Sequence, residues 1–207
     1  MNISAFDFIG CVNQSINDNE YAIESLDRAI GDGDHYINLK RGMGVIENQK
    51  NVLKTMDLSS QFKLIGMKIL SSVGGASGPL LASFFLEFAK TYPQKEPTLK
   101  DFAHSFNQGV RAIQHRGKSN LGEKTMLDVL IPVSEKLLAL TDSTGDTQKI
   151  AAEIDALAQS CAEKTKDLLP AKGRSTGLGE RALGHMDPGA KSCQVIISSI
   201  CNEIIKG

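Results

Sequence analysis

The sequence has few aromatic residues and no long apolar run. Aromatic side chains make up 5% of the 207 residues, and tryptophan is absent. Because 41% of the residues are nonetheless apolar, the composition favours a core of Leu, Ile, Ala and Met, as in helical proteins, over a β-sandwich. No stretch of about 18 apolar residues occurs, so we expect no membrane span. The first residues lack the basic and apolar regions of a signal peptide, which favours a cytoplasmic location.

The charge is balanced and the cysteines are scattered. The formal net charge is −1, and no basic stripe of the kind that binds nucleic acid is present. The four cysteines form no CxxC pair and are expected to be small buried hydrophobic residues in a reducing compartment. The length suits one large domain better than two very small ones, so residues 1–207 are predicted to form a single domain.

Apolar residues recur at three- and four-residue spacings along most of the chain. This periodicity predicts about eight helices and no convincing strand. Asp187 and Pro188 are residue types favoured at an N-cap and at the first helical position, and Pro132 is expected to kink its helix. Glycine-containing joints separate the helical segments. The expected helical ranges are 1–17, 19–30, a segment from about 35, 57–70, 80–89, 97–116, 124–140, 147–169 and 187–205.

The sharpest feature is an acidic turn in which Asp27, Asp32 and Asp34 follow a D-x4-D-x-D spacing. Three carboxylates this close repel one another unless cations neutralise them. Hard oxygen ligands of this kind suit Mg²⁺ or Ca²⁺. Gly31 and Gly33 allow the loop to turn sharply and to point the carboxylates inward. The turn is therefore predicted to hold a divalent cation, with a solvated acidic turn that binds nothing as the alternative.

Two known loop patterns do not fit this turn. In an EF-hand counted from Asp32, the fifth and twelfth positions would be Tyr36 and Met43, where Asp or Asn and Glu are needed. A dinucleotide fingerprint fails because its third glycine and its preceding strand are missing. His35 follows the turn directly, and it is expected either to lie beside a nucleotide or to cap the next helix.

Three further glycine-containing segments carry candidate chemistry. Residues 74–79 precede a helix start, where phosphate binds readily, although the turn could equally serve close helix packing. Residues 116–128 carry Lys and Arg that could neutralise phosphate or simply be surface charges. Residues 173–189 form a polar joint longer than plain connectors usually are. No nucleophile with an adjacent base is visible, which fits phosphoryl transfer, where positioned donors and metals do most of the work.

Four segments, in this order along the chain, resemble motifs of the nucleotide-binding L subunit of bacterial dihydroxyacetone kinase. They are residues 26–35, 71–80, 122–129 and 173–190. The resemblance covers nearly the whole chain and implies an all-α barrel of eight antiparallel helices, with ADP or ATP bound at one rim. Two departures are Tyr36, where the family usually has Gly, and Glu123, where Asp is common. Tyr36 is expected to reshape the turn, and Glu123 to be neutral.

The resemblance also implies roles for individual residues. Asp27, Asp32 and Asp34 would bind two Mg²⁺ ions that bridge to the phosphates. Ala76 and Ser77 would hold phosphate, Arg174 would stabilise its charge, and residues 187–189 would close the adenine side. The residues implied in nucleotide binding are His35, Asn38, Ala76, Ser77, Gly117, Thr125, Met126, Arg174, Asp187, Pro188 and Gly189.

In the family the sugar is held elsewhere. The resemblance implies a separate K subunit that binds dihydroxyacetone covalently through a histidine, so this chain would supply only the phosphoryl group. It further implies that ADP stays bound as a coenzyme and is rephosphorylated by an M subunit of the phosphotransferase system. The alternatives are an ATP-exchanging kinase subunit for another triose or tetrose, a nucleotide-bound partner of a transcription regulator, and a helical hydrolase that uses the same metals.

Overall fold

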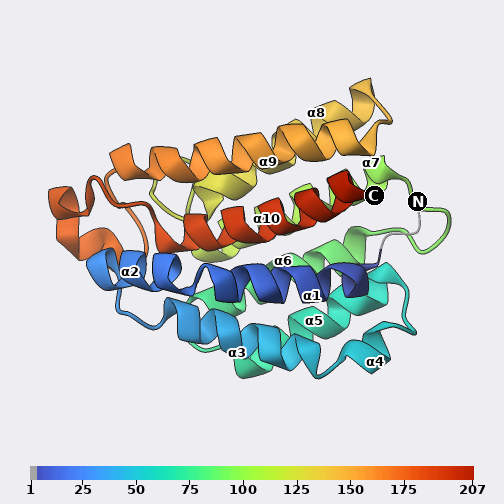
Figure 1. Cartoon of the computed structure of the whole chain (residues 1–207), viewed down its shortest axis with the longest axis horizontal. Coiled ribbons are helices and arrows are strands. Elements are labelled where there is room, and N and C mark those ends of the chain that lie inside the picture. Colours follow the sequence, from blue (N-terminus) through green and yellow to red (C-terminus); the bar gives the residue numbers. More distant parts are fainter. Residues whose placement is uncertain (1–3) are drawn as a thin grey trace.

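The structure is a computed structural model, and it describes residues 4–207. Helices account for all regular secondary structure in this range, and no strand occurs in it, so the predicted all-α class is confirmed (Figure 1). The predicted helix over residues 1–17 appears from Ala5 onward, and its first three residues lie outside the described range. The helices are α1 (Ala5–Asp18), α2 (Glu20–Ile30), α3 (His35–Glu47), α4 (Lys50–Leu53), α5 (Leu58–Ser72), α6 (Ser77–Thr91), α7 (Leu99–Gly117), α8 (Leu127–Ser143), α9 (Thr147–Lys164) and α10 (Pro188–Lys206), with 3-10 helices η1 (Thr165–Asp167) and η2 (Arg174–Ala182).

The long helices pack mainly against their neighbours in the chain. From α5 to α10 each helix contacts the next, α10 contacts α1, and α1 and α5 both contact α3. Figure 1 shows that α3, α6, α8 and α10 begin at one end of the molecule, on the left, whereas α5, α7 and α9 begin at the opposite end. The more detailed prediction of a barrel of eight antiparallel helices stays a prediction, as does the single domain. No helix in residues 4–207 has both the length and the apolar character that crossing a bilayer needs.

The few aromatic residues gather in one part of the core. Phe88 is fully buried and stacks on Phe62 with ring centroids 4.1 Å apart and on Tyr92 at 5.2 Å. Helices α6 and α7 approach closely here because Gly109 has no side chain: a Cβ at this position would lie 2.6 Å from Cδ2 of Phe84. The three buried cysteines (Cys161, Cys193 and Cys201) also lie in this cluster, as predicted, whereas Cys11 is half-buried elsewhere.

Several helix boundaries differ from the predicted ones for local reasons. Helix α6 begins at Ser77 rather than Leu80, so the glycine turn is shorter than predicted. Helix α8 begins at Leu127 rather than Lys124, because Lys124 has a left-handed backbone (φ 59°) that an α-helix excludes. Helix α8 continues through Pro132. The helix predicted over 147–169 ends at Lys164 and gives way to η1, and part of the predicted 173–189 joint is the 3-10 helix η2.

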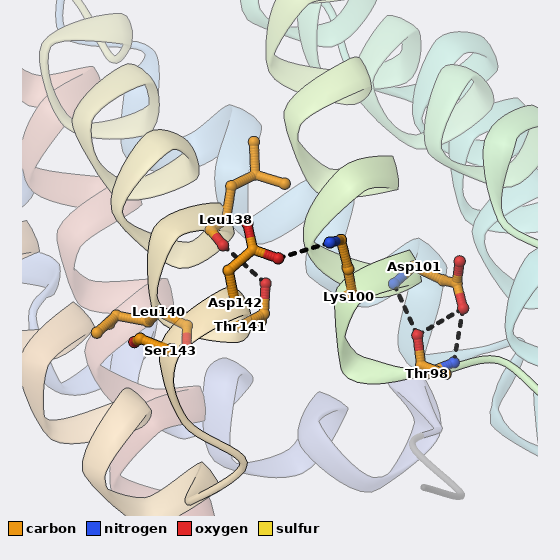
Figure 2. A network of polar contacts seen from close by, with 8 residues as sticks. All are labelled: Thr98, Lys100, Asp101, Leu138, Leu140, Thr141, Asp142 and Ser143. Carbon is orange, nitrogen blue, oxygen red and sulfur yellow. Dashed lines mark hydrogen bonds and ion pairs between the residues drawn. The ribbon is translucent and has the colours of Figure 1, made fainter.

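The starts of α5, α7 and α9, at the right-hand end of Figure 1, are capped by the side chains of their N-cap residues. At the start of α7, Oγ1 of Thr98 accepts a hydrogen bond from the Asp101 amide at 3.2 Å, and the Asp101 carboxylate accepts one from the Thr98 amide at 2.8 Å (Figure 2). This is a complete capping box. Lys100, also in Figure 2, joins α7 to the end of α8 through an ion pair of 2.5 Å with Asp142. The helix start predicted at residue 57 is confirmed: Asp57 caps α5 by accepting a hydrogen bond from the Ser60 amide at 3.0 Å.

Candidate functional site

A cavity of about 440 Å³ opens at the opposite end of the molecule. The end of α2, the end of α7 and the starts of α3, α6, α8, η2 and α10 all contribute to its lining. We call this the cavity end, and the end that carries the Thr98 capping box the far end. All four of the glycine-containing joints singled out in the sequence meet at the cavity end, so the chain folds segments far apart in sequence around one space.

The acidic turn lies in the lining of this cavity. One ligand atom each from Asp27, Asp32 and Asp34 lies within 4.8 Å of the others. Asp27 is buried, and its Oδ2 accepts a hydrogen bond from the His35 amide at 2.9 Å. Gly31 is required beside it, since a Cβ there would lie 1.9 Å from Oδ1 of Asp27. Three carboxylates held this close form an oxygen ligand set that suits a hard cation such as Mg²⁺.

Arg174 approaches the same turn from η2. Its Nε lies 2.8 Å from Oδ2 of Asp32, and both side chains are well exposed. Gly173, just before it, has φ 80°, a left-handed conformation that glycine adopts without strain. A cation and an anionic cluster are thus presented together at the cavity mouth.

At three helix starts of the cavity, the N-cap residue provides no side-chain cap. The N-cap residues of α3, α6 and α8 are Asp34, Ala76 and Met126, and none of their side chains accepts a hydrogen bond from its helix. The turn before α6 is tight, because a Cβ at Gly78 would lie 2.1 Å from the carbonyl oxygen of Val73. The first amides of α3 and α8 donate to other side chains, His35 to Asp27 and Leu127 to Oγ1 of Thr125 at 3.2 Å, whereas the start of α6 has no side-chain cap. Unpaired amides at the positive end of a helix attract anions, phosphate among them.

The loop before α8 is fixed by two charged side chains. The buried carboxylate of Asp128 accepts hydrogen bonds from the Gly122 amide at 2.5 Å and the Thr125 amide at 2.7 Å. Lys124 is fully buried, and its Nζ donates to the carbonyl oxygens of Thr165 at 2.5 Å and His185 at 2.7 Å. Burial lowers the pKa of Lys124, and nearby carboxylates, Asp187 first, oppose this effect. Lys124 therefore ties two sides of the cavity together.

The start of α10 is closed by Asp187. Its Oδ2 accepts a hydrogen bond from the Ala190 amide at 2.7 Å, and its own amide donates to Oγ1 of Thr165 at 2.9 Å. The predicted helix start at Asp187 and Pro188 is therefore confirmed. Although the residue keeps some exposure to the cavity, protein surrounds its carboxyl group, and burial raises the pKa of Asp187 to about 7.

His35 faces the same helix. Its Nε2 lies 3.0 Å from Oγ of Ser192 in α10. Burial lowers the pKa of His35, against the opposing effect of Asp27 and Asp34. As the first residue of α3, His35 also follows directly on the N-cap residue of that helix. Its imidazole thus bridges α3 and α10 beside the acidic turn.

The structure brings together nearly all of the residues that the sequence singles out. Every predicted metal ligand and nucleotide contact lines the cavity except Asn38. Asn38 is buried below the glycine turn, where its Nδ2 would lie 3.7 Å from a Cβ at Gly75 and its Oδ1 accepts a hydrogen bond from Nη1 of Arg41 at 3.0 Å. Its predicted contact with the nucleotide, like the binding roles of the other residues, stays a prediction.

Tyr36 and Glu123, the two departures from the motifs, both lie outside the cavity lining. Tyr36 is buried and packs against α1 and α2, where its hydroxyl donates to Oε2 of Glu20 at 3.0 Å. Glu123 holds its own loop by accepting a hydrogen bond from the Asn120 amide at 2.8 Å. Tyr36 therefore acts on the packing of α3 and not on the cavity itself.

Sequence reasoning missed two features of the site. It treated Lys124 as a possible phosphate or surface charge, and it gave no part to the apolar side chains Ile30, Leu80 and Ile113, which form an apolar wall of the cavity. The apolar residues at helix ends gave no signal because their periodicity is that of ordinary core residues. The burial of Lys124 depends on carbonyl groups that lie 41 and 61 residues further along the chain.

Fold and site together define a class of protein: an all-α fold with a carboxylate cluster and several helix starts around one cavity. A family model described as DAK2 domain matches residues 29–202. The chain is 38% identical over 187 residues to the ADP-binding subunit DhaL of PEP-dependent dihydroxyacetone kinase 1 from Listeria innocua, covering 90% of this chain and 89% of that one. It is 36% identical over 184 residues to the ADP-binding subunit DhaL of the PEP-dependent kinase from Escherichia coli, covering 88% and 87%.

The chain belongs to the DAK2 domain family, and these two relatives are subunits of phosphotransferases. The fold is similar to that in the crystal structure of the dihydroxyacetone kinase from C. freundii in complex with AMP-PNP and Mg²⁺, with a TM-score of 0.75 and 24% identity. That similarity covers 96% of this chain and 33% of the other. The chain therefore corresponds to about a third of that larger kinase and to most of the length of the DhaL subunits.

Proposed function

We propose that this chain is the nucleotide-binding, phosphoryl-transferring subunit of a dihydroxyacetone kinase. The observation that carries the proposal is the placement of three carboxylates, within 4.8 Å of one another, beside the uncapped start of α6 in a single cavity. Carboxylates bind the metal of a metal–nucleotide complex, and free amides bind its phosphates. The relatives named as ADP-binding subunits support the same ligand.

In this proposal Asp27, Asp32 and Asp34 hold two Mg²⁺ ions, whose charge would offset that of the phosphates during transfer. Ala76 and Ser77 offer backbone amides and a hydroxyl to phosphate at the start of α6. Arg174 lies 2.8 Å from Asp32, close enough to the metal ligands to stabilise charge on the transferring group.

The nucleoside would occupy the other side of the cavity. Gly117, Thr125 and Met126 line it from α7 and α8, and residues 187–189 close it at α10. His35 and Asn38 would contact the nucleotide along α3. Because Asp187 already accepts the Ala190 amide and Pro188 has no N–H, this helix start offers few amides to phosphate, which favours the base rather than the phosphates at this wall.

The acceptor would be dihydroxyacetone held covalently on a separate K subunit. ADP would remain bound as a coenzyme and would be rephosphorylated in place by an M subunit of the phosphotransferase system. The PEP-dependent type of the kinases from Listeria innocua and Escherichia coli supports this donor over exchanging ATP.

The test is ADP retention by the purified chain. Replacing Asp32 with Ala should reduce the ADP that survives gel filtration in Mg²⁺, by at least the roughly 10–100-fold affinity loss that even outer-shell partners of metals cause. Asp7→Ala, which removes an exposed carboxylate of α1 at the far end, is the matched control and should retain ADP like the wild type. Undiminished ADP in Asp32→Ala would rule out the metal assignment, and no transfer to a K subunit with its phosphodonor system would rule out the proposed reaction.

A further inference from the structure

A second hollow lies on the outer surface between α6 and α7. Its volume is about 560 Å³, and it is lined by α6 from Pro79 to Lys90, by α7 from Gln108 to Arg116, and by Leu70 at the edge of α5. We call it the α6–α7 groove. Pro79 and Arg116 line both the groove and the cavity, so the groove leads directly to the cavity end.

The floor of the α6–α7 groove is apolar. Ala82, Leu86 and Ala112 lie in its lining at helical spacings on the two facing helices. At its edge Leu70 is 49% exposed, and Met67, one turn earlier on α5, is 54% exposed. Large apolar side chains exposed beside a groove are typical of surfaces that bind another protein.

The α7 wall of the groove is basic. Arg111, His115 and Arg116 occupy the last two turns of α7, and all three are exposed. Within residues 4–207 neither arginine has an ion-pair partner, and the one acidic residue of the groove lining, Glu87, is paired with Lys90 at 3.1 Å. The formal net charge of the chain is −1, so this excess of positive charge is local to the groove.

We propose that the α6–α7 groove docks an acidic, amphipathic segment of the protein that presents the phosphoryl acceptor. This inference rests on the proposed function, because an acceptor held on another protein must be brought to the mouth of the cavity. Residues 111 and 115 are about 6 Å apart along the helix axis, which matches acidic side chains one turn apart on a partner helix. The apolar face of the same segment would cover the half-buried Leu86 and Ala112, in the manner of an amphipathic helix bound in a groove.

Two other occupants fit the groove less well. A small anion would satisfy the arginines but would leave the apolar floor and Leu70 exposed. Nucleic acid would require the basic residues to continue as a stripe, whereas the α6 wall of the groove carries the neutralised pair of Glu87 and Lys90. Apolar floor and basic wall together favour an acidic protein segment.

The experiment measures phosphoryl transfer at increasing concentrations of the purified dihydroxyacetone-holding subunit. Arg111→Glu reverses one charge of the groove and leaves the cavity untouched, since Arg111 is not part of the cavity lining. We expect the KM for the partner subunit to rise at least about tenfold, because like charges at an interface are strongly unfavourable. The kcat and the Mg-dependent retention of ADP should not change. Lys63→Glu, an exposed charge of α5 outside the groove, is the matched control.

A steric variant and salt provide independent readouts. Ala112→Trp fills the apolar floor, and it should also raise the KM for the partner if its melting temperature shows that it folds. Added KCl should weaken binding of the wild type more than binding of Arg111→Glu, because screening acts on the charge contacts that the variant has lost.

The outcomes separate this inference from the proposed function. Transfer by the wild type with an unchanged KM in Arg111→Glu would overturn the groove proposal alone. If the partner binds the wild type but no phosphoryl group is transferred, the proposed function fails, and calorimetric binding of the partner to Arg111→Glu still decides the role of the groove. A partner that does not bind the wild type overturns both.

Discussion

Three long helices that begin at the far end are capped by the side chains of their own N-cap residues, whereas three that begin at the cavity end are not. Asp57, Thr98 and Asp146 cap α5, α7 and α9. The N-cap side chains of α3, α6 and α8 make no such bond. The first amides of α3 and α8 donate instead to Asp27 and Thr125. Since an N-cap contributes about 1 kcal/mol, the uncapped start of α6 gives up stability and keeps amides that a ligand can bind. The exception is α10, where Asp187 closes the helix start.

The largest loss of stability is expected at Gly78, where the tight turn at the cavity end leaves no room for a side chain. In Gly78→Ala the new Cβ would lie 2.1 Å from the carbonyl oxygen of Val73, so the turn before α6 must open. We expect a loss of about 3 kcal/mol, the upper end for overpacked positions, together with weaker ADP retention. Urea unfolding with and without Mg–ADP measures both effects.

Gly44→Ala is the matched control for this substitution. Gly44 lies inside α3, and nothing approaches the position of its Cβ within 4 Å. Alanine in a helix interior should therefore add about 0.5–1 kcal/mol of stability. If Gly78→Ala were equally harmless, the tight turn would not be what shapes the start of α6.

The sequence predicts the far end better than the cavity end, and the reason is local. Helix starts can be predicted at Asp57 and Pro97-Thr98 because a capping side chain and the backbone amide that it accepts lie within four residues of each other. Asp27, Asp32 and Asp34 are likewise close in sequence, so the acidic turn could be found. The course of residues 165–187 could not be predicted, because it depends on Lys124 bonding to two distant carbonyl groups. Periodicity carries no information about such long-range contacts.

The exception at α10 gives a pH-dependent prediction. The pKa of Asp187 is about 7 in the folded chain and about 3.9 in an unfolded one. Between about pH 4 and pH 7 the Asp187 carboxyl group holds a proton in the folded chain but not in the unfolded chain. Its contribution to the free energy of unfolding is therefore complete below about pH 4 and is lost as the pH rises through 7. Asn also caps helices, so Asp187→Asn should keep the cap without this dependence.

Melting temperatures without nucleotide, from pH 4.5 to 8, test this prediction. Other carboxylates titrate equally in both proteins, so the informative quantity is the difference between Asp187→Asn and the wild type. It should grow in favour of the variant as the pH rises toward about 7, the pKa of Asp187, and then level off. A difference that is constant with pH would show that the carboxyl group is already ionised in the folded chain.

A pair of hydroxyl deletions separates stability from binding. Thr98→Ala removes the capping box at the far end (Figure 2) and should cost about 1 kcal/mol, which lowers the melting temperature by roughly 2–4 °C for a chain of this size. ADP retention should not change. Ser77→Ala at the start of α6 removes no cap, so it should leave the melting temperature unchanged and weaken retention. If both variants changed the melting temperature and ADP retention equally, the two ends would not differ in the way proposed, one serving stability and the other binding.

The smallest effect is expected at the ion pair that links α7 and α8 at the far end. Lys100 and Asp142 are 2.5 Å apart, but their side chains are 67% and 61% exposed. The pKa of Lys100 is raised by its hydrogen bond to Asp142, yet solvent and salt screen exposed pairs, and holding two flexible side chains together costs entropy. A double-mutant cycle with Lys100→Ala and Asp142→Ala should therefore give a coupling too small to shift the melting temperature measurably. A clear coupling energy that disappears in high salt would contradict this expectation. It would mean that the ion pair stabilises the far end in addition to the capping box at Thr98.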